Sequence, residues 1–380
     1  MRRRLRSAGL ALLLTVAATA RAQAQGSVFA FRGLGWSGRP VSARTAGTAG
    51  SLAMFDPMMS LNPSALARWR SVAAWAVSVP SKADYRGSSG SAQFQTVRFP
   101  LIGFAAILPR RTVIGLSISD YLDRTWTVTQ RDSFVIRGDT ESFTDAGRSI
   151  GGVSDMALGV GYRLHENLFV GLGLHYYLGS TRLTAQRVFT NTLYDDILEQ
   201  SATDFRGGGV AAGISVTRGK LDFAASGRLN SRLRSANSTG AIVHTPLPPQ
   251  LAFGLRLQPV PGVYIAGNAT WDGWSRANAD LTAGGGEQAR DAWAISVGAD
   301  VQRVTLIKLR TPLRLGYRWR QLPFTSLGTP INEWAVSGGI GFSLARDRTS
   351  IDIAAEGGKR SAGTASESFK SLFFGLTVRP

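Results

Sequence analysis

The chain of 380 residues contains no cysteine and only three histidines. Without thiols it cannot form disulfides and cannot build a thiolate metal site. The sequence also has no phosphate-binding loop, metal-ligand cluster or dinucleotide fingerprint. We therefore expect no cofactor and no metal, and stability must come from packing and hydrogen bonding.

Long hydrophobic runs are missing as well. After the first 24 residues, no segment reaches the roughly 18 uncharged apolar residues that a membrane-spanning helix requires. If the mature chain is integral to a membrane, it must cross as a closed barrel, because only closure pairs every backbone group within lipid.

Acidic residues are scarce: the sequence has 25 Asp and Glu but 43 Lys and Arg, so the formal net charge is +18. The basic residues are nearly all arginine and are scattered, without a basic run after the N-terminus. This distribution does not favour nucleic acid as a partner. An anionic lipid or an anionic solute fits the charge better.

The first residues, 1–24, are typical of a secretory signal peptide. They combine a basic start, an apolar stretch from Ala8 to Ala20 and the cleavage sequence Ala22-Gln23-Ala24. Export to the outer membrane of a Gram-negative-type bacterium is therefore expected. The predicted organisation is a signal peptide at 1–24, an N-terminal plug segment with a short helix at 25–70, and a transmembrane β-barrel at 71–380.

Strict alternation of side-chain character is the main pattern of the mature chain. Between residues 156 and 164, Met, Leu, Val, Tyr and Leu alternate with Ala, Gly, Gly and Arg. The same pattern recurs at 168–178, 251–257, 313–320 and 372–379. One face is apolar and the other is small or cationic, which predicts an outer wall that meets lipid and a crowded interior.

The pattern predicts an all-β fold, an antiparallel transmembrane β-barrel of about fourteen strands. The strands are expected near 71–80, 93–108, 113–131, 143–164, 168–190, 200–217, 220–231, 249–258, 262–276, 288–302, 310–320, 331–345, 349–358 and 366–379. Tight turns are expected near 109–111, 165–167, 218–219, 259–261 and 346–348. Longer polar links are expected near 81–92, 132–142, 191–199, 232–248, 277–287, 321–330 and 359–365.

The segment from Gly26 to Arg70 does not alternate, and we expect it to be inserted into the barrel. Asn62 and Pro63 have the character of an N-cap and a first helical residue, so a short helix should follow them.

At this segment the chain resembles the FadL family of outer-membrane transporters for hydrophobic compounds. The matching residues are Ala43 to Gly50, Asp56-Pro57, Asn62 to Ala67 and the strand Leu315-Gly316-Tyr317-Arg318-Trp319-Arg320. The resemblance implies a fourteen-stranded barrel whose N-terminal segment plugs the lumen. It also implies transport of hydrophobic or amphipathic small molecules, such as long-chain fatty acids.

Departures from the family pattern accompany this match. Phe55 to Met59 replaces the usual acidic pair, the external loops are short, and the chain ends on Val378-Arg379-Pro380 without a terminal aromatic residue. Outer-membrane lipid, lipopolysaccharide and the barrel-assembly machinery are the further partners expected for such a barrel.

Candidate substrate-binding residues lie on the predicted inner face, where arginine forks could attract a carboxylate or phosphate. The alternative is that these arginines pair with lumen carboxylates such as Asp155 and Asp222 and hold strands together. The candidates are Arg163, His175, Tyr177, Arg256, Arg314 and Arg318.

Gly47, Gly50, Asn62 and Pro63 are the candidate gating residues of the plug, because glycine and proline permit tight backbone paths. A static cork has the same composition and is the alternative. Most tryptophans are expected in the interfacial girdle, with a minority on a ligand path. They are Trp69, Trp75, Trp126, Trp271, Trp274, Trp293, Trp319 and Trp334.

Catalysis is not expected. His165 falls in a predicted turn, His244 in a loop, and His175 has no serine or aspartate partner at an evident spacing. The second functional hypothesis is a structural or secretion-associated barrel that binds a partner protein and carries no solute.

Overall fold

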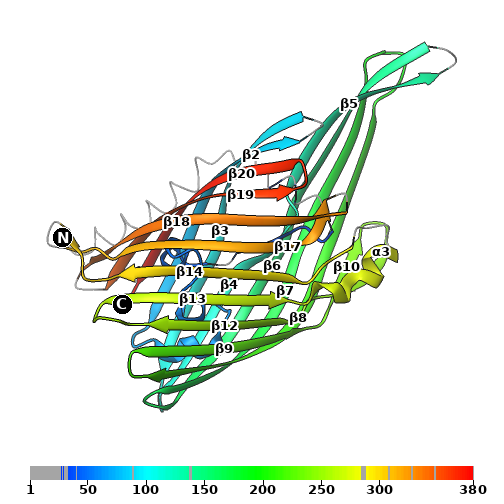
Figure 1. Cartoon of the computed structure of the whole chain (residues 1–380). Helices are drawn as coiled ribbons and strands as arrows, with labels where there is room; N and C mark the ends of the chain where they lie inside the picture. Colours follow the sequence, from blue (N-terminus) through cyan, green and yellow to red (C-terminus); the bar gives the residue numbers. More distant parts are fainter. Residues whose placement is uncertain are drawn as a thin grey trace, which may run out of the picture.

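The computed structural model describes residues 27, 29, 33–39, 41–87, 90–136, 139–283, 288–306, 309–326, 328–345 and 348–379. The predicted signal peptide lies outside these residues. Long tilted strands form a cylinder, and the N-terminal segment, drawn in dark blue, lies between its near and far walls (Figure 1).

Fourteen antiparallel strands close this cylinder, as predicted, and β20 pairs with β2 to complete the ring. Three of the fourteen consist of two consecutive segments, namely β4 with β5, β9 with β10, and β11 with β12. The strands are β2 (Ala73–Gly87), β3 (Gly90–Leu108), β4 (Thr112–Asp123), β5 (Trp126–Ile136), β6 (Asp139–His165), β7 (Leu168–Phe189), β8 (Ile197–Arg218), β9 (Leu221–Asn230), β10 (Arg232–Asn237), β11 (Ile242–Pro246), β12 (Gln250–Leu257), β13 (Val263–Asp272), β14 (Ala292–Val301), β17 (Leu313–Ser326), β18 (Thr329–Leu344), β19 (Thr349–Ala362) and β20 (Ala365–Val378).

The remaining elements are short. In the N-terminal segment they are β1 (Trp36–Ser37), α2 (Ala43–Gly47), η2 (Ala53–Phe55) and η3 (Pro63–Arg68). The β13–β14 connection holds η4 (Trp274–Ala277) and α3 (Asn278–Ala283), and β15 (Thr305–Leu306) pairs with β16 (Leu309–Arg310). In the part of the chain that the structure describes, every helix is too short or too polar to span a membrane.

The two faces of the wall follow the predicted alternation. On β6, Leu158 and Val160 are exposed on the outside, whereas Asp155 and Ala157 are buried inside. On β17, Leu315 faces outward and Arg318 inward. Because each strand turns its apolar side chains to the outside, the outer wall is suited to lipid.

Several links that we expected to be loops are instead paired strands. Residues 81–87 pair with 90–96, 132–136 pair with 139–143, and β17 extends to Ser326 before it meets β18. The prediction was wrong there because apolar alternation stops where both faces meet water, although the hydrogen-bond ladder continues. Strands β5, β6, β7 and β8 accordingly extend beyond the rest of the wall (Figure 1).

Within the described residues, no backbone pairing joins β3 to β5. Strand β3 pairs with β4 from Leu101 to Leu108, but its earlier residues pair with β2 and β5 pairs with β6. We call this boundary the β3–β5 seam. Strand β1 lies beside it, since Trp36 pairs with Asp123 and the Gly38 N–H donates to the Tyr121 carbonyl over 2.7 Å.

Candidate functional site

The short helix η3 begins as the sequence predicted. Asn62 is its N-cap, and the Asn62 side-chain oxygen accepts from the Ser64 backbone N–H over 3.1 Å. The Asn62 amide nitrogen donates to the Met54 carbonyl over 2.8 Å and to the Ser215 hydroxyl of β8 over 3.1 Å. The cap therefore also ties the N-terminal segment to the barrel wall.

Glycines on the inner wall allow η3 to approach the backbone of the strands. A Cβ atom at Gly171 would lie 2.3 Å from the Pro63 carbonyl carbon, and one at Gly213 would lie 2.1 Å from the Asn62 side-chain oxygen. At Gly161 it would lie 2.5 Å from the Ala67 nitrogen. The small residues of the predicted inner face are thus required by close packing of the N-terminal segment.

Helix α2 packs against the opposite side of the interior. The Ser337 hydroxyl of β18 donates to the Gly47 carbonyl over 3.1 Å, and Gly50 has a left-handed φ of +99°. Arg44 binds Asp300 of β14 over 3.0 Å. Burial alone would lower the pKa of Arg44, but Asp300 and Asp56 raise the pKa above its usual value, so this guanidinium stays charged.

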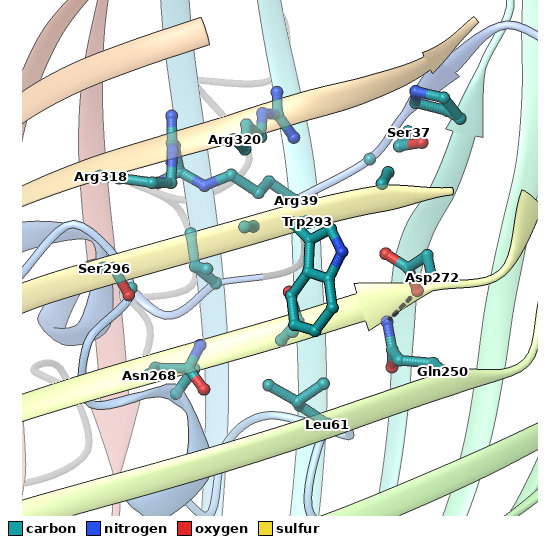
Figure 2. Close-up of a pocket in the computed structure, with 18 of the residues that line it drawn as sticks. Ser37, Arg39, Leu61, Gln250, Asn268, Asp272, Trp293, Ser296, Arg318 and Arg320 are labelled. Atoms are coloured by element: carbon teal, nitrogen blue, oxygen red, sulfur yellow. Dashed lines mark hydrogen bonds between the residues drawn. The ribbon is translucent and has the colours of Figure 1, made fainter. Parts of the chain in front are cut away.

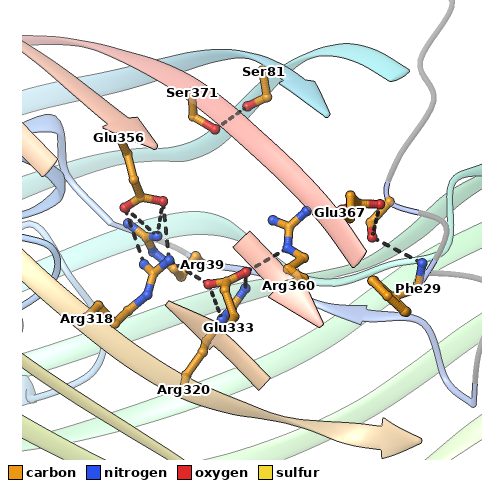
Figure 3. Close-up of polar contacts among 11 residues, drawn as sticks. Phe29, Arg39, Ser81, Arg318, Arg320, Glu333, Glu356, Arg360, Glu367 and Ser371 are labelled. Carbon is orange, nitrogen blue, oxygen red and sulfur yellow. Dashed lines mark hydrogen bonds and ion pairs between the residues drawn. The ribbon is translucent and has the colours of Figure 1, made fainter. Parts of the chain in front are cut away.

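Inward-facing charges of β17, β18, β19 and β20 form a continuous ladder with one arginine of the N-terminal segment (Figure 3). Glu333, which is 1% exposed, accepts from Arg318 over 2.6 Å, from Arg320 over 2.7 Å and from Arg360 over 2.7 Å. We call this group the arginine–glutamate ladder, and its members are Arg39, Arg318, Arg320, Glu333, Glu356, Arg360 and Glu367.

Three of the four predicted lumen arginines have carboxylate partners. Arg256 binds Asp222 over 2.6 Å, Arg314 binds Asp352 over 2.6 Å, and Arg318 belongs to the ladder. Arg163 instead lies 5.7 Å from the ring centroid of Phe169. These arginines are spread around the wall and do not form one binding site.

His175 and Tyr177 both point inward from β7, as predicted. A ring nitrogen of His175 lies 2.9 Å from the Asp155 carboxylate, and the Tyr177 hydroxyl donates to Asn230 over 2.7 Å. Asp155 also meets Arg228 over 3.4 Å. The alternative that lumen arginines pair with carboxylates is therefore confirmed for Asp222, which binds Arg256. Asp155 instead contacts His175 and Arg228, and Arg228 was not among the predicted residues.

A cavity of about 190 Å³ lies between the N-terminal segment and strands β13, β14 and β17. Apolar side chains such as Leu61 and Trp293 line it together with polar and charged ones such as Arg39, Asn268 and Asp272 (Figure 2). Within the described residues, buried polar atoms of Arg39, Arg228 and Asn268 that line it have no hydrogen-bond partner. Alternation along β13 and β17 places Asn268 and Arg320 inward, but nothing in the sequence showed that they share a cavity with Arg39.

The tryptophans divide between the two surfaces. Trp293 and Trp334 are exposed on the outer wall, where an interfacial girdle was expected. Trp75 and Trp274 are buried at 4% and 3% exposure and lie in the interior, and Trp274 lines the cavity. Both pack in apolar clusters of the interior, because neighbouring inward positions are apolar at those levels.

A closed antiparallel barrel with an apolar outer wall and its own N-terminal segment against the inner wall defines a membrane-spanning β-barrel protein. A family model described as BamG matches residues 3–240, which is more than half of the chain. The chain belongs to the BamG family.

Solved structures of similar fold include a Pseudomonas aeruginosa FadL homologue, with 12% identity and a TM-score of 0.62 over 90% of this chain and 98% of that one. The Pseudomonas putida toluene transporter TodX has 13% identity and a TM-score of 0.60, covering 90% and 98%. The Ralstonia pickettii toluene transporter TbuX has 13% identity and a TM-score of 0.55, covering 89% and 98%.

Those TM-scores establish a shared fold, so the resemblance to the FadL family is supported at the level of architecture. None of the curated protein sequences matches this chain significantly.

Proposed function

We propose that the protein is an outer-membrane channel that admits small amphipathic molecules into its lumen. The observation that carries this proposal is the partly open cavity beside the β3–β5 seam. Ser37, Ser119 and Tyr121 line the cavity and lie at that seam. A molecule could therefore reach the cavity from the wall as well as from the external mouth.

The size and lining of the cavity narrow the substrate class. A cavity of about 150 Å³ holds one benzene ring, and drug-sized ligands occupy roughly 300–1,000 Å³. The present cavity of about 190 Å³ therefore suits a single ring with one polar group better than a long acyl chain. The four arginines of the lining outnumber its three aspartates, which favours an anionic or hydrogen-bond-accepting group.

The relatives support a channel for small apolar compounds, since two of the similar structures are described as toluene transporters. In this proposal the N-terminal segment plugs the lumen, with Gly47, Gly50, Asn62 and Pro63 at its contacts with the wall. Fatty acids, which the sequence resemblance implied, would use the cavity only for one end of the molecule.

A cavity-filling substitution tests the channel. Ala294 lines the cavity from β14, and Ala299 of the same strand lies between the outward residues Ile265 and Leu315. We expect Ala294→Trp to abolish binding of phenylphosphonate to the purified barrel, measured by calorimetry, and Ala299→Trp to leave binding unchanged. Equal binding by the two variants would refute the channel proposal.

The family name favours a second function. "BamG" points to the barrel-assembly machinery, and a lumen closed by paired charges suits an accessory subunit that carries no solute. We expect a strain that lacks the protein to contain less of other outer-membrane barrels if this is its role. Complementation with Ala294→Trp separates the two functions, because it would restore barrel levels without restoring uptake.

A further inference from the structure

Lysine is rare in this chain and is concentrated at one place on its outer wall. The sequence has five lysines among its 43 basic residues. Three of them, Lys82, Lys359 and Lys370, come from the neighbouring strands β2, β19 and β20. All three are exposed.

The register brings these lysines together on the outer face. Lys82 is directly opposite Lys370, and Lys370 is opposite Gly357, two residues before Lys359. Directly opposite residues have Cβ atoms about 5 Å apart, and diagonal neighbours are about 7–8 Å apart. Like charges at these separations repel each other, so the arrangement gains stability when an anion lies between them.

No carboxylate of this face neutralises the group. Glu356 and Glu367, on the same strands, point inward and belong to the arginine–glutamate ladder. Asp84 faces outward on β2 and accepts from the Gln93 amide over 2.6 Å, but its single negative charge leaves the three lysines with a net positive charge. Within the described residues, none of the three lysines forms an ion pair.

The three lysines lie at the upper edge of the apolar belt. On β20, the outward residues below Lys370 are Leu372, Phe374, Leu376 and Val378. The eight steps from Lys370 to Val378 span about 26 Å along the strand, and a strand tilt of about 40° reduces this to about 20 Å along the barrel axis, which fits within the apolar band of about 25 Å on such barrels. Trp334, exposed and directly opposite Lys359, marks the same interfacial level.

We propose that Lys82, Lys359 and Lys370 bind the phosphate-bearing headgroup of an anionic lipid in the outer leaflet. Their ammonium groups would surround the phosphate, while the acyl chains lie on Leu372 and Phe374 below. Lysine suits this site because it acts as a compact, mobile cation with three donors. The assignment holds whether the barrel is a channel or an assembly subunit, because it uses only the outer wall.

Lipid binding by the purified full-length barrel tests the site. We would titrate the protein in neutral detergent with phosphatidylglycerol or with phosphatidylcholine, and measure retained lipid by native mass spectrometry. The unaltered protein should retain phosphatidylglycerol preferentially. The triple variant Lys82→Gln, Lys359→Gln, Lys370→Gln should bind it about 100-fold more weakly.

Two matched variants serve as controls. The triple replacement by arginine keeps the charge and should retain the lipid, and Lys220→Gln, in the turn that follows β8 at the other end of the barrel, should bind as the unaltered protein does. If the glutamine variant does not fold, the proposal is tested by the salt dependence of lipid retention in the unaltered protein. Retention must fall as ionic strength rises, because the proposed binding is electrostatic. Equal retention by the glutamine variant, salt-independent binding, or full displacement by inorganic phosphate at equal concentration would overturn the proposal.

Discussion

Two sides of the barrel interior hold the same N-terminal segment by different physical means. The wall of β6, β7 and β8 offers bare glycine backbone, against which η3 packs at van der Waals distance. The wall of β17, β18 and β19 offers arginines and glutamates, and the segment contributes Arg39 to their ladder. Close packing thus fixes the position of the N-terminal segment on the glycine side. On the other side, the need to keep buried charges paired limits which residues can replace the arginines and glutamates.

Neither side resembles an open pore. The wall of β6, β7 and β8 is filled by η3, and the carboxylates of the wall of β17, β18 and β19 are paired with arginines. Between the two walls lies the cavity, where single atoms of Arg39, Arg228 and Asn268 lack hydrogen-bond partners. Substitutions on the two sides should therefore differ in size of effect, and this difference can be measured.

The largest effect is expected from Glu333→Gln on the charged wall. The change keeps the size of the side chain but leaves the buried guanidiniums of Arg318, Arg320 and Arg360 without their shared carboxylate. Removing one partner of a buried ion pair costs about 3–5 kcal/mol. Urea unfolding of the barrel in detergent would show the loss, and a change below about 1 kcal/mol would mean that the ladder is not energetically important.

A smaller effect is expected from Gly171→Ala on the glycine wall. Its new Cβ would overlap the backbone at Pro63, so η3 must shift, at a cost of about 1–3 kcal/mol. Limited proteolysis should then cut the N-terminal segment faster. Gly357→Ala is the matched control, since its Cβ would meet only an ordinary contact at 3.9 Å and cleavage should not change. Equal cleavage of the two variants would contradict the close fit.

The next largest effect is expected from Asn62→Ala. It removes the cap of η3 and the link to Ser215, and the loss of a buried cap costs about 1–2 kcal/mol. The same unfolding assay measures it. The barrel itself should keep its circular-dichroism spectrum, because Asn62 belongs to no strand; a loss of β signal would show that the segment is needed for closure.

The smallest effect is expected from Asp145→Asn, beyond both interior walls. Asp145 and Arg187 form an ion pair over 2.7 Å on the extension of β6 and β7, where water screens it. Unfolding should be indistinguishable from that of the unaltered protein. A loss as large as that of Glu333→Gln would show that burial is not what distinguishes the two ion pairs.

The comparison also shows which parts of the fold were readable in advance. All fourteen strands, the cap at Asn62 and the inward direction of His175 and Arg318 followed from period-two alternation and local capping rules. The extended hairpins above the barrel could not be predicted in this way, because a strand that is exposed to solvent on both faces has no apolar face and so shows no alternation. Alternation also did not show that Trp75 and Trp274 are among the tryptophans of the interior, since a tryptophan near a strand end fits either surface.

The candidate site was less accessible to prediction. The sequence indicated that inner-face arginines exist, but it did not show which carboxylate each one meets. Arg318 reaches Glu356 across 38 positions of sequence, and Arg39 reaches the same residue across 317. Such partners are set by strand register and by the path of the N-terminal segment, neither of which a local pattern encodes.

The sequence by itself determined that this chain forms a closed barrel with a lipid-facing exterior, because side-chain alternation and backbone hydrogen bonding are local requirements. Only the tertiary structure decided the pairing of the interior charges, the cavity beside the β3–β5 seam and the meeting of three lysines on the outer wall. Those features depend on which residues closure brings opposite one another, and closure is a property of the whole ring.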